Sequence, residues 1–380
     1  MSTVEERVER VHREFVADRM GRIRQAGTID PRGKAVDKIK EICERSLYHF
    51  CVFVLNRQYL TKTLHLPVCN WLMKTPPYRK LLLLPRTHAK TSMVSHGLPL
   101  HMIVQPENGV YMPWKSGAEM RIGIMGETEQ RATNNLRVVR SVLEGNDLFR
   151  GFWPHLVWES PRRQAPVWNA TDMTIPRDGD YPDPTFVAKG VGGAITGARL
   201  DAEIKDDLVS EEAANSVTVM EKTIDYHINS RALFDDQDRS LEYIIGTRWA
   251  VRDLYSYILQ TDPTVARVVR SIIEDDEPIY PEAFTLETIE RLKQEFGVMF
   301  HLLYMNNIAD PDLVDFPEDR LRMFDMQADL LLFDETELDK ELEKKYGAPV
   351  EPIEIQRGEP LYEVLGRMSM REEYFRARAN

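Results

Sequence analysis

The sequence has few cysteines, no long apolar run and no excess of basic residues. Cys43, Cys51 and Cys69 are its three cysteines, and none forms a C-x-x-C pair, which argues against a structural zinc site. Their apolar neighbours predict buried free thiols in a reducing compartment. The apolar run at residues 81–85 is far shorter than the ~20 residues that span a bilayer. The charged amino terminus has no apolar segment of a secretory signal, so we expect a soluble, intracellular protein.

The acidity of the chain is concentrated near its carboxyl end. The net charge is −12, and residues 310–380 contain 19 Asp and Glu against 10 Lys and Arg. Residues 1–309 are therefore close to neutral. An overall negative charge does not exclude a locally basic channel, because only the surface that faces an anion has to be basic. The remaining composition, with 43% hydrophobic and 29% charged residues, is that of a globular protein with two or three domains.

Apolar periodicity divides the chain into four regions. We expect a helical amino-terminal region at 1–60, an α/β core at 61–260, a helical lid or linker at 261–325 and an acidic helical tail at 326–380. In the core, short apolar runs alternate with helical patterns, which predicts a mainly parallel central sheet flanked by helices. The expected strands are at 80–84, 121–125, 173–175, 186–188, 202–205 and 243–247.

The segment LLLLPRTHAKTS at 81–92 has the order buried strand, tight loop, Lys-Thr and helix. Backbone N–H groups in such a loop can hold phosphate at a helix start. Lys90 would reach the terminal phosphates and the Thr91 hydroxyl would bind magnesium. The pattern G-x-x-x-x-G-K-[ST] has glycines where this chain has Leu84 and Ala89, so a basic loop without phosphate stays an alternative. Arg86 favours the phosphate interpretation, because a second cation suits a polyphosphate.

A pair of carboxylates follows the strand expected at 202–205. Asp206 would hold magnesium through its waters, and Asp207 would polarise the attacking water as a general base. Glu203 and Lys205 interrupt what should be a buried apolar strand. An Asp-Asp pair can also cap a helix, which is the alternative interpretation of these residues.

A third element, Gly246-Thr247-Arg248, ends the strand expected at 243–247. A hydroxyl and a guanidinium at that position can donate to a γ-phosphate and so sense its loss. Thr247 could instead only cap the following turn. Parallel sheets place ligands at the carboxyl ends of their strands, so the three elements are expected to converge.

The order of these motifs resembles the ATPase domain of the large subunit of tailed-phage terminase, a DNA-packaging motor. The resemblance covers most of residues 47–325. Residues 85–91 resemble the family's Pro-Arg-Gly-His-x-Lys-Ser/Thr loop, and residues 190–199 followed by Asp206-Asp207 resemble its run into the Walker B acids. Other similar segments are residues 50–56, 65–72, 126–148, 245–249, 280–284 and 300–306.

The resemblance implies a P-loop NTPase fold of the ASCE/RecA-like class that uses ATP and magnesium (Mg2+). It implies that Asp207, Arg86 and Lys90 are catalytic, that Thr91 and Asp206 bind the metal, and that Gly246, Thr247 and Arg248 couple hydrolysis to movement. The nucleotide-binding loop would consist of Pro85, Arg86, Thr87, His88, Ala89, Lys90, Thr91 and Ser92. Thr87 and Ala89 stand where the family commonly has glycine, and Asp207 is shorter than the Glu of many relatives. We therefore expect slow but real hydrolysis.

The resemblance also implies partners. They are double-stranded DNA, the portal protein and the small terminase subunit, with no membrane partner. The chain would work as a homo-oligomeric ring in the host cytoplasm, transiently at the procapsid portal. A neighbouring subunit would donate an arginine, for which Arg131, Arg137 and Arg140 are candidates. Gln58 and His65 lie where relatives contact the adenine base.

The nuclease domain of the family is not expected in this chain. Residues 326–380 show charged helical patterns around a proline-rich linker and no alternating apolar strands, so we expect no nuclease activity here. Either the nuclease would be a separate polypeptide, or the gene would be split or truncated. Two other functions stay open: a non-catalytic adaptor with a P-loop fold, and a helicase-like ATPase outside packaging.

Overall fold

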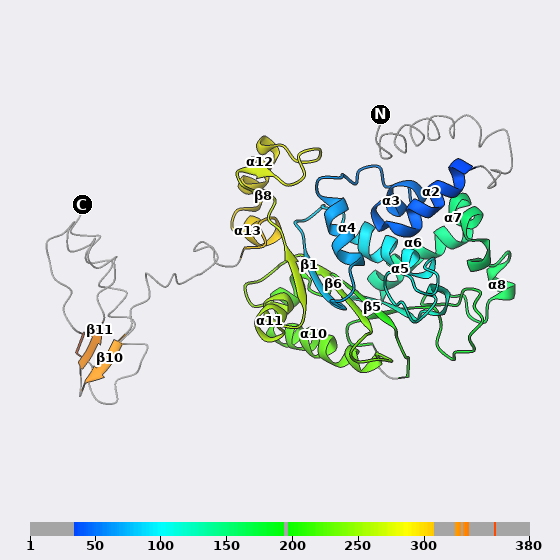
Figure 1. Ribbon diagram of the computed structural model, residues 1–380. Helices are drawn as coiled ribbons and strands as arrows, with labels where there is room; N and C mark the ends of the chain where they lie inside the picture. The colour runs from blue at the N-terminus through cyan, green and yellow to red at the C-terminus, as the bar shows by residue number, and fades with distance from the viewer. Residues whose placement is uncertain (1–33, 194–196, 308–323, 328–329, 334–352, 355–380) are drawn as a thin grey trace. The chain divides into compact units, whose positions relative to one another are not determined.

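A seven-stranded sheet forms the centre of the first of two units, Met1–Ile308 and Ala309–Asn380. The computed structural model describes residues 34–193, 197–307, 324–327, 330–333 and 353–354 (Figure 1). The sheet has the order β3-β4-β2-β5-β6-β1-β7, and every neighbouring pair is parallel except β3 with β4. The strands are β1 Arg79–Leu83, β2 Ile122–Gly126, β3 Asp172–Met173, β4 Phe186–Gly190, β5 Ala202–Asp206, β6 Leu241–Gly246 and β7 Ala266–Val269.

Helices cover both faces of this sheet, which confirms the predicted α/β fold (Figure 1). One face carries α2 Lys34–Arg45, α3 Leu47–His49, η1 Phe50–Val54, α4 His65–Met73, η2 Ser92–Gly97, α5 Leu98–Ile103, α6 Glu129–Gly145 and α7 Asp147–Phe152. The other face carries α9 Glu211–Ala214, α10 Val217–Ser230 and α11 Leu254–Thr261. One strand, β6, separates β1 from β5, as expected for an ASCE-type P-loop fold.

Each central strand is buried on both faces. Leu82 and Leu84 pack in the core on the α6 side, whereas Leu81 and Leu83 pack in the core on the α10 side. This explains why β1 is a continuous apolar run and not an alternating one. Burial of a leucine side chain stabilises by about 1.5–3 kcal/mol, so the site-bearing strand is held firmly from both sides.

Helix α6 begins at a cap and ends at a glycine, as its sequence predicts. The Thr128 side chain accepts from the backbone N–H of Arg131, which satisfies one of the free donors of the first turn. Its buried face repeats every three to four residues and consists of Ala132, Leu136, Val139 and Leu143. The opposite face stays polar and is available for other contacts.

The prediction of an entirely helical region at 261–325 was wrong. Strand β7 belongs to the central sheet and pairs with β1, so the sheet extends past residue 260. A hairpin of β8 Ile273–Glu274 and β9 Glu277–Pro278 follows it. Strand β7 is a short edge strand, four residues long, and such a length holds too little periodicity to be recognised. The helical expectation holds for α12 Leu286–Phe296 and α13 Met299–Leu303.

The second unit contains strands where a helical tail was expected. An antiparallel sheet of order β10-β11-β12 consists of Phe324–Gln327, Leu330–Phe333 and Ile353–Glu354. The helical prediction for the tail was therefore wrong at these positions. Short apolar stretches among many acidic residues, such as the one in β11, gave no recognisable period. The predicted helix at residues 1–33 lies outside the described residues.

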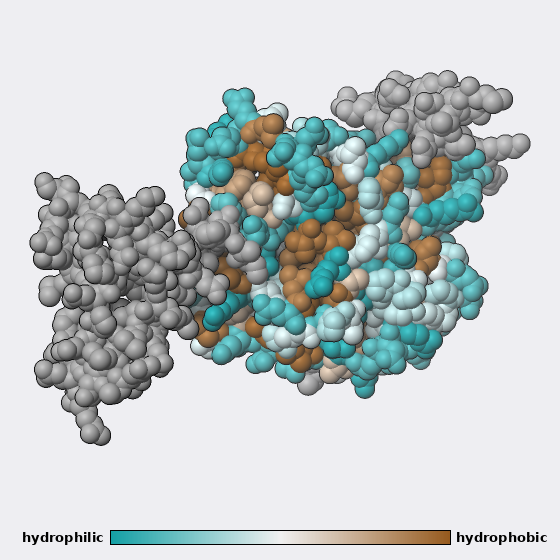
Figure 2. Space-filling model, turned by 60° about the vertical axis from the view of Figure 1, so that its left-hand side comes forward, coloured by the Kyte–Doolittle hydropathy of each residue, from teal (hydrophilic) through white to brown (hydrophobic). Residues whose placement is uncertain are grey.

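Three further observations concern surface and burial in the described part of the chain. No helix there combines the length and the apolar character needed to cross a bilayer. Cys43, Cys51 and Cys69 are buried free thiols, as predicted. Figure 2 shows hydrophobic residues on one face in separate areas among hydrophilic ones. Large apolar side chains such as Leu286 and Val298 are about half exposed, at 55% and 48%.

Candidate functional site

The loop that follows β1 contains two residues in a conformation that favours glycine. Thr87 has φ 62° and Ala89 has φ 59°. The left-handed region costs a residue with a Cβ roughly 1–2 kcal/mol. A loop that passes through this region turns successive N–H groups toward a common centre, which is the geometry of an anion-binding nest. The resemblance described in the sequence analysis implies glycine at these two positions, so the loop has the conformation of glycine without the residue.

Lys90 lies buried at the centre of this loop. Its Nζ donates to the carbonyl oxygens of Leu84 at 2.7 Å and Pro85 at 3.1 Å, and to Thr247 Oγ1 at 2.9 Å. Burial lowers the pKa of Lys90, although the Asp207 and Asp206 carboxylates oppose that change. The contact with Thr247 brings the loop and the end of β6 together, as the motif order predicts.

Asp206, the last residue of β5, receives three hydrogen bonds. Thr91 Oγ1 donates to Oδ1 at 3.3 Å, while Ser95 Oγ at 2.6 Å and Asn135 Nδ2 at 3.0 Å donate to Oδ2. Burial and the charge of Asp207 raise the pKa of Asp206 to about 7, and the two hydroxyl donors oppose this. The pairing of Thr91 with Asp206 brings together the two residues expected to bind a metal.

Ser95 and Asn135 are members of this cluster that sequence reasoning missed. Ser95 follows Thr91 by four residues in the same helical segment, a spacing that places both hydroxyls on one face and could have been recognised. Asn135 comes from the middle of α6, and no motif marks it. Both are fixed by packing of helices against the sheet, which the sequence does not reveal.

Asp207 has φ 46° and turns the chain sharply at the end of β5. Its backbone N–H donates to the Ile245 carbonyl at 3.0 Å. Its Oδ1 atom is buried and has no hydrogen-bond partner among the described residues. An acceptor of this kind is costly to bury, and such groups concentrate at sites that bind something.

Gly246 lies under the ring of Tyr255. A Cβ at position 246 would lie 1.8 Å from the Tyr255 hydroxyl oxygen, so no side chain fits there. The hydroxyl of Tyr255 is itself buried without a partner among the described residues. Burial raises the pKa of Tyr255, and the nearby Asp207 carboxylate adds to this effect. The end of β6 therefore contacts α11 as closely as the backbone allows.

The two arginines of the predicted site are directed to different places. The Arg86 guanidinium lies 4.7 Å from the centre of the Trp249 ring, and its backbone N–H donates to Leu303. Arg248 is buried and forms an ion pair with Asp253 at 3.0 Å, together with a hydrogen bond to the Ser256 hydroxyl. Asp253 caps α11, so Arg248 is directed to the start of that helix. Of the predicted coupling residues, Thr247 is the one that contacts Lys90.

His88 packs against aromatic rings and does not face the centre of the loop. Its ring stacks on Phe284 at 4.9 Å and meets Tyr280 edge-on at 5.6 Å. Burial lowers the pKa of His88 to about 4, so its ring is neutral at pH 7. His65 contacts the same Tyr280 ring at 5.0 Å. At the other end of the loop, the Tyr59 hydroxyl donates to Ser92 Oγ at 2.7 Å.

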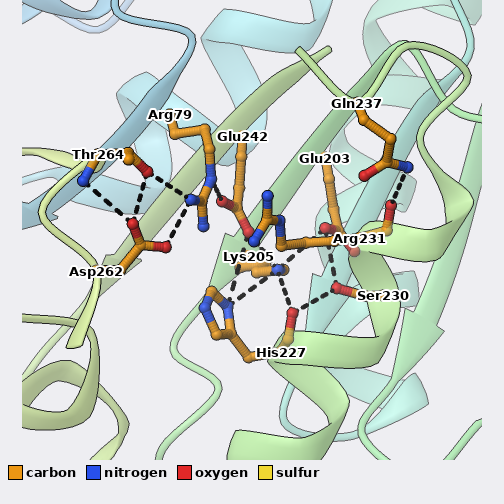
Figure 3. A network of polar contacts seen from close by, with 10 residues as sticks. All are labelled: Arg79, Glu203, Lys205, His227, Ser230, Arg231, Gln237, Glu242, Asp262 and Thr264. Carbon is orange, nitrogen blue, oxygen red and sulfur yellow. Dashed lines mark hydrogen bonds and ion pairs between the residues drawn. The ribbon is translucent and has the colours of Figure 1, made fainter. Parts of the chain in front are cut away.

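The two charged residues that interrupt β5 are buried in an ion-pair network (Figure 3). Lys205 Nζ lies 2.5 Å from Glu242 Oε1 and 3.1 Å from Glu203 Oε2. Arg79 continues the network through Glu242 at 2.6 Å and Asp262 at 2.5 Å. Burial works against ionisation, but the Lys205 charge and its neighbours hold the pKa of Glu242 at about 2. Glu203 and Lys205 thus form an ion pair, although Glu203 Oε1 has no hydrogen-bond partner among the described residues, and every residue of the strand is buried.

The other predicted residues make local contacts on the surface. Arg131 pairs with Glu127 at 3.1 Å, Arg137 donates to Asn134 and Arg140 donates to the Asn169 carbonyl. The Gln58 side-chain amide donates to the Val52 carbonyl at 3.1 Å. These contacts leave the proposed trans-acting and base-contacting roles as predictions.

The donor set suits a magnesium nucleotide. Thr91 and Asp206 supply hydroxyl and carboxylate oxygens, which are the ligands that magnesium prefers. The Lys90 ammonium, at present bonded to carbonyl oxygens, is the cation that a terminal phosphate requires. The Oδ1 atom of Asp207, which has no hydrogen-bond partner within the described ranges, can accept from a water molecule.

Solved structures of phage terminases are similar to this chain. The ATPase domain of the Thermus phage P74-26 large terminase matches in two crystal structures, with 16% identity in both. The TM-scores are 0.40 and 0.35, over 64% and 60% of this chain and 93% and 87% of the others. The HK97 bacteriophage large terminase matches with 15% identity and a TM-score of 0.39 over 61% of this chain. This chain spans 47% of the HK97 protein.

No protein-family model and no curated protein matches the sequence. The likeness to phage large terminases is therefore a likeness of structure at low identity. At such identities the role of each residue has to come from the geometry of the site itself.

Proposed function

We propose that this chain hydrolyses ATP in the presence of magnesium at the carboxyl ends of β1, β5 and β6. The observation that carries the proposal is the convergence of Lys90, Thr247, Thr91 and Asp206 within hydrogen-bond distance in pairs. Their positions in the chain span 157 residues, so only the fold brings them together. A structural turn requires neither a buried lysine nor two adjacent carboxylates beside it.

Each residue has a role that follows from its position. Lys90 and the N–H groups of the loop from Pro85 to Ser92 bind and orient the phosphates. Thr91 and Asp206 hold magnesium, which neutralises charge on the β- and γ-phosphates when bound. Asp207 accepts a proton from the attacking water at its Oδ1 atom, the buried oxygen for which the described part of the chain supplies no hydrogen-bond partner. Arg86, beside Trp249, supplies a second cation at the edge of the loop.

Thr247 is the group that can respond to hydrolysis. Its hydroxyl accepts from Lys90, so a change in the contacts of Lys90 alters the environment of the β6 end. Gly246 transmits such a change to α11, because Tyr255 lies directly against its Cα. Arg248 fixes the start of the same helix through Asp253. These contacts support the proposed coupling of hydrolysis to movement.

We further propose that hydrolysis drives double-stranded DNA into a procapsid. The chain would act as a ring of identical subunits, together with a portal protein and a small terminase subunit. This proposal rests on the motif order and places the chain in the host cytoplasm and at the portal.

The decisive experiment compares ATP hydrolysis by the wild-type chain and by Lys90→Ala, with and without linear duplex DNA. We expect magnesium-dependent hydrolysis in the wild type and a loss of about 100- to 1,000-fold in the variant, because a buried phosphate-binding cation is removed. Equal rates in the two proteins would overturn the phosphate site. A wild-type chain that binds no ATP by calorimetry would instead be an adaptor, and unwinding of a tailed duplex would indicate a helicase.

A further inference from the structure

The hydrogen bonds of Asp206 are divided unequally between its two oxygens. A carboxylate oxygen has two lone-pair sites. Both sites on Oδ2 are occupied, by Ser95 Oγ at 2.6 Å and Asn135 Nδ2 at 3.0 Å. Oδ1 accepts one bond, from Thr91 Oγ1 at 3.3 Å. The free acceptor site of Asp206 is therefore on the oxygen that faces Thr91.

The orientation of the Asn135 amide is fixed by a second contact. Its Oδ1 atom lies 3.2 Å from Nε2 of His96. An amide oxygen only accepts, so Nε2 of His96 has to carry the proton and donate. Burial lowers the pKa of His96 to about 4, so the ring is neutral and holds a single proton at pH 7. The donor chain runs from His96 through Asn135 to Asp206.

Asn135 contributes little to the packing of its own helix. The residues that hold α6 against the sheet are Ala132, Leu136, Val139 and Leu143, all buried and apolar. Asn135 lies beside this stripe and is half-buried. A polar side chain at such a position is explained by the carboxylate that it reaches. Ser95 is fully buried, and its hydroxyl likewise has Asp206 as its partner.

We propose that Asn135 and Ser95 are positioning residues that orient the Asp206 carboxylate for a divalent cation held between Asp206 and Thr91. Because these two residues occupy both acceptor sites of Oδ2, the remaining acceptor site of Asp206 is on Oδ1, beside the Thr91 hydroxyl. Groups of this kind orient a metal ligand without touching the metal, and their loss typically weakens metal binding 10- to 100-fold. The inference rests on the proposed magnesium site and adds to it two residues outside the loop and the Asp-Asp pair.

The test measures binding of Mn2+ in the presence of ADP by electron paramagnetic resonance of the free ion. In Asn135→Leu we expect Mn2+ affinity to fall about 10-fold, while ADP affinity without metal stays at the wild-type value. Ser95→Ala should change Mn2+ affinity in the same direction. Asn134→Leu is the matched control, because Asn134 lies one residue away on α6 and its side chain accepts hydrogen bonds from Gln130 and Arg137.

The outcomes separate positioning from a general loss of structure. A role in packing alone would lower ADP and Mn2+ affinity together, whereas positioning lowers Mn2+ affinity alone. Wild-type Mn2+ affinity in Asn135→Leu would overturn the proposal. If Asn135→Leu does not fold, Ser95→Ala decides by the same criterion.

Failure of the proposed function gives a different pattern. A wild-type chain that binds Mn2+ with ADP but hydrolyses no ATP would remove the function and leave the positioning role. If the wild-type chain hydrolyses ATP and both variants keep the wild-type Mn2+ affinity, the proposed function stands and the positioning role is overturned.

Discussion

The two faces of β5 carry two polar clusters with opposite character. On the α10 face, Glu203 and Lys205 lie in an ion-pair network where charges of opposite sign are matched at 2.5–3.1 Å. On the α6 face, Asp206 accepts from neutral donors, and the adjacent Asp207 has a buried oxygen without a partner among the described residues. Neighbouring residues of one strand point to opposite faces, so Lys205 and Asp206 belong to different clusters although they are adjacent in β5.

The difference teaches how to distinguish a structural polar cluster from a binding site. In the network each charge has a partner of opposite sign, as Lys205 has in Glu242, although one buried oxygen of Glu203 also lacks a hydrogen-bond partner among the described residues. The candidate site instead combines two adjacent carboxylates with strained backbone, at Ala89 and Asp207. The four predictions that follow test this distinction, from the largest expected effect to the smallest.

Asp207→Asn should lower the rate of hydrolysis and leave the stability of the fold unchanged. Loss of the general base should lower the rate of ATP hydrolysis about 100- to 10,000-fold, because an amide oxygen does not take up the proton of the water. Steady-state hydrolysis and urea unfolding of the same preparations measure the two effects. If the free energy of unfolding falls by as much as the activation free energy of hydrolysis rises, Asp207 belongs to the structural cluster.

The main effect of Lys205→Met should be a loss of stability. Removal of the central cation leaves Glu203 and Glu242 facing each other in a buried space, which should lower the free energy of unfolding by about 3–5 kcal/mol. The double variant Lys205→Met with Glu203→Leu should recover part of this loss. The control is Lys222→Met on the exposed side of α10, which should change stability by less than about 0.5 kcal/mol. Denaturant titration checks all three.

His227 makes the ion-pair network sensitive to acid. Burial and the Lys205 charge lower the pKa of His227 to about 3, below the value of about 6.5 in the unfolded chain. The unfolded state therefore binds the proton first, and this contribution to stability is complete above pH 6.5 and is lost as the pH falls toward 3. The stability advantage of wild type over His227→Gln should shrink by up to about 2 kcal/mol between pH 6.5 and pH 5. An unchanged difference across that range would contradict a buried neutral histidine.

Ala89→Gly should stabilise the chain slightly. Relief of the left-handed strain at φ 59° outweighs the extra freedom of glycine in the unfolded state, so we expect a gain of roughly 0.5–1 kcal/mol. Ala132→Gly, inside α6, is the matched control and should lose about 1 kcal/mol or more. Thermal unfolding measures both. A loss at position 89 would show that the loop is not strained there.

The central sheet could be predicted from the sequence because its strands are buried on both faces. Continuous apolar runs such as Leu81–Leu84 and Tyr243–Ile245 identify β1 and β6 without further context. Strand β7 was missed because an edge strand of four residues shows no run and barely one alternation. Strand β5 was doubtful because its charges are compensated by Glu242 and Arg79, residues far away in the chain.

The candidate site likewise contains residues that the sequence reveals and residues that it does not. Lys90, Thr91, Asp206 and Thr247 are recognisable because each lies at or after the carboxyl end of a buried strand, and the structure brings them together in pairs. Asn135 is not recognisable, because its contact depends on how α6 lies over the end of β5. Arg248 shows the converse: its position after β6 suggested a phosphate ligand, but the nearby Asp253 is its partner.

The three hydrogen bonds of Lys90 have a consequence for the thermodynamics of ligand binding. A free lysine side chain loses up to about 2 kcal/mol of rotamer entropy when it is immobilised. Here Leu84, Pro85 and Thr247 already hold the ammonium in one place, so this entropy is lost during folding and not when a nucleotide arrives. Calorimetry of ADP binding should then show a smaller unfavourable entropy for the wild type than for Thr247→Val, in which one of the three restraints is absent.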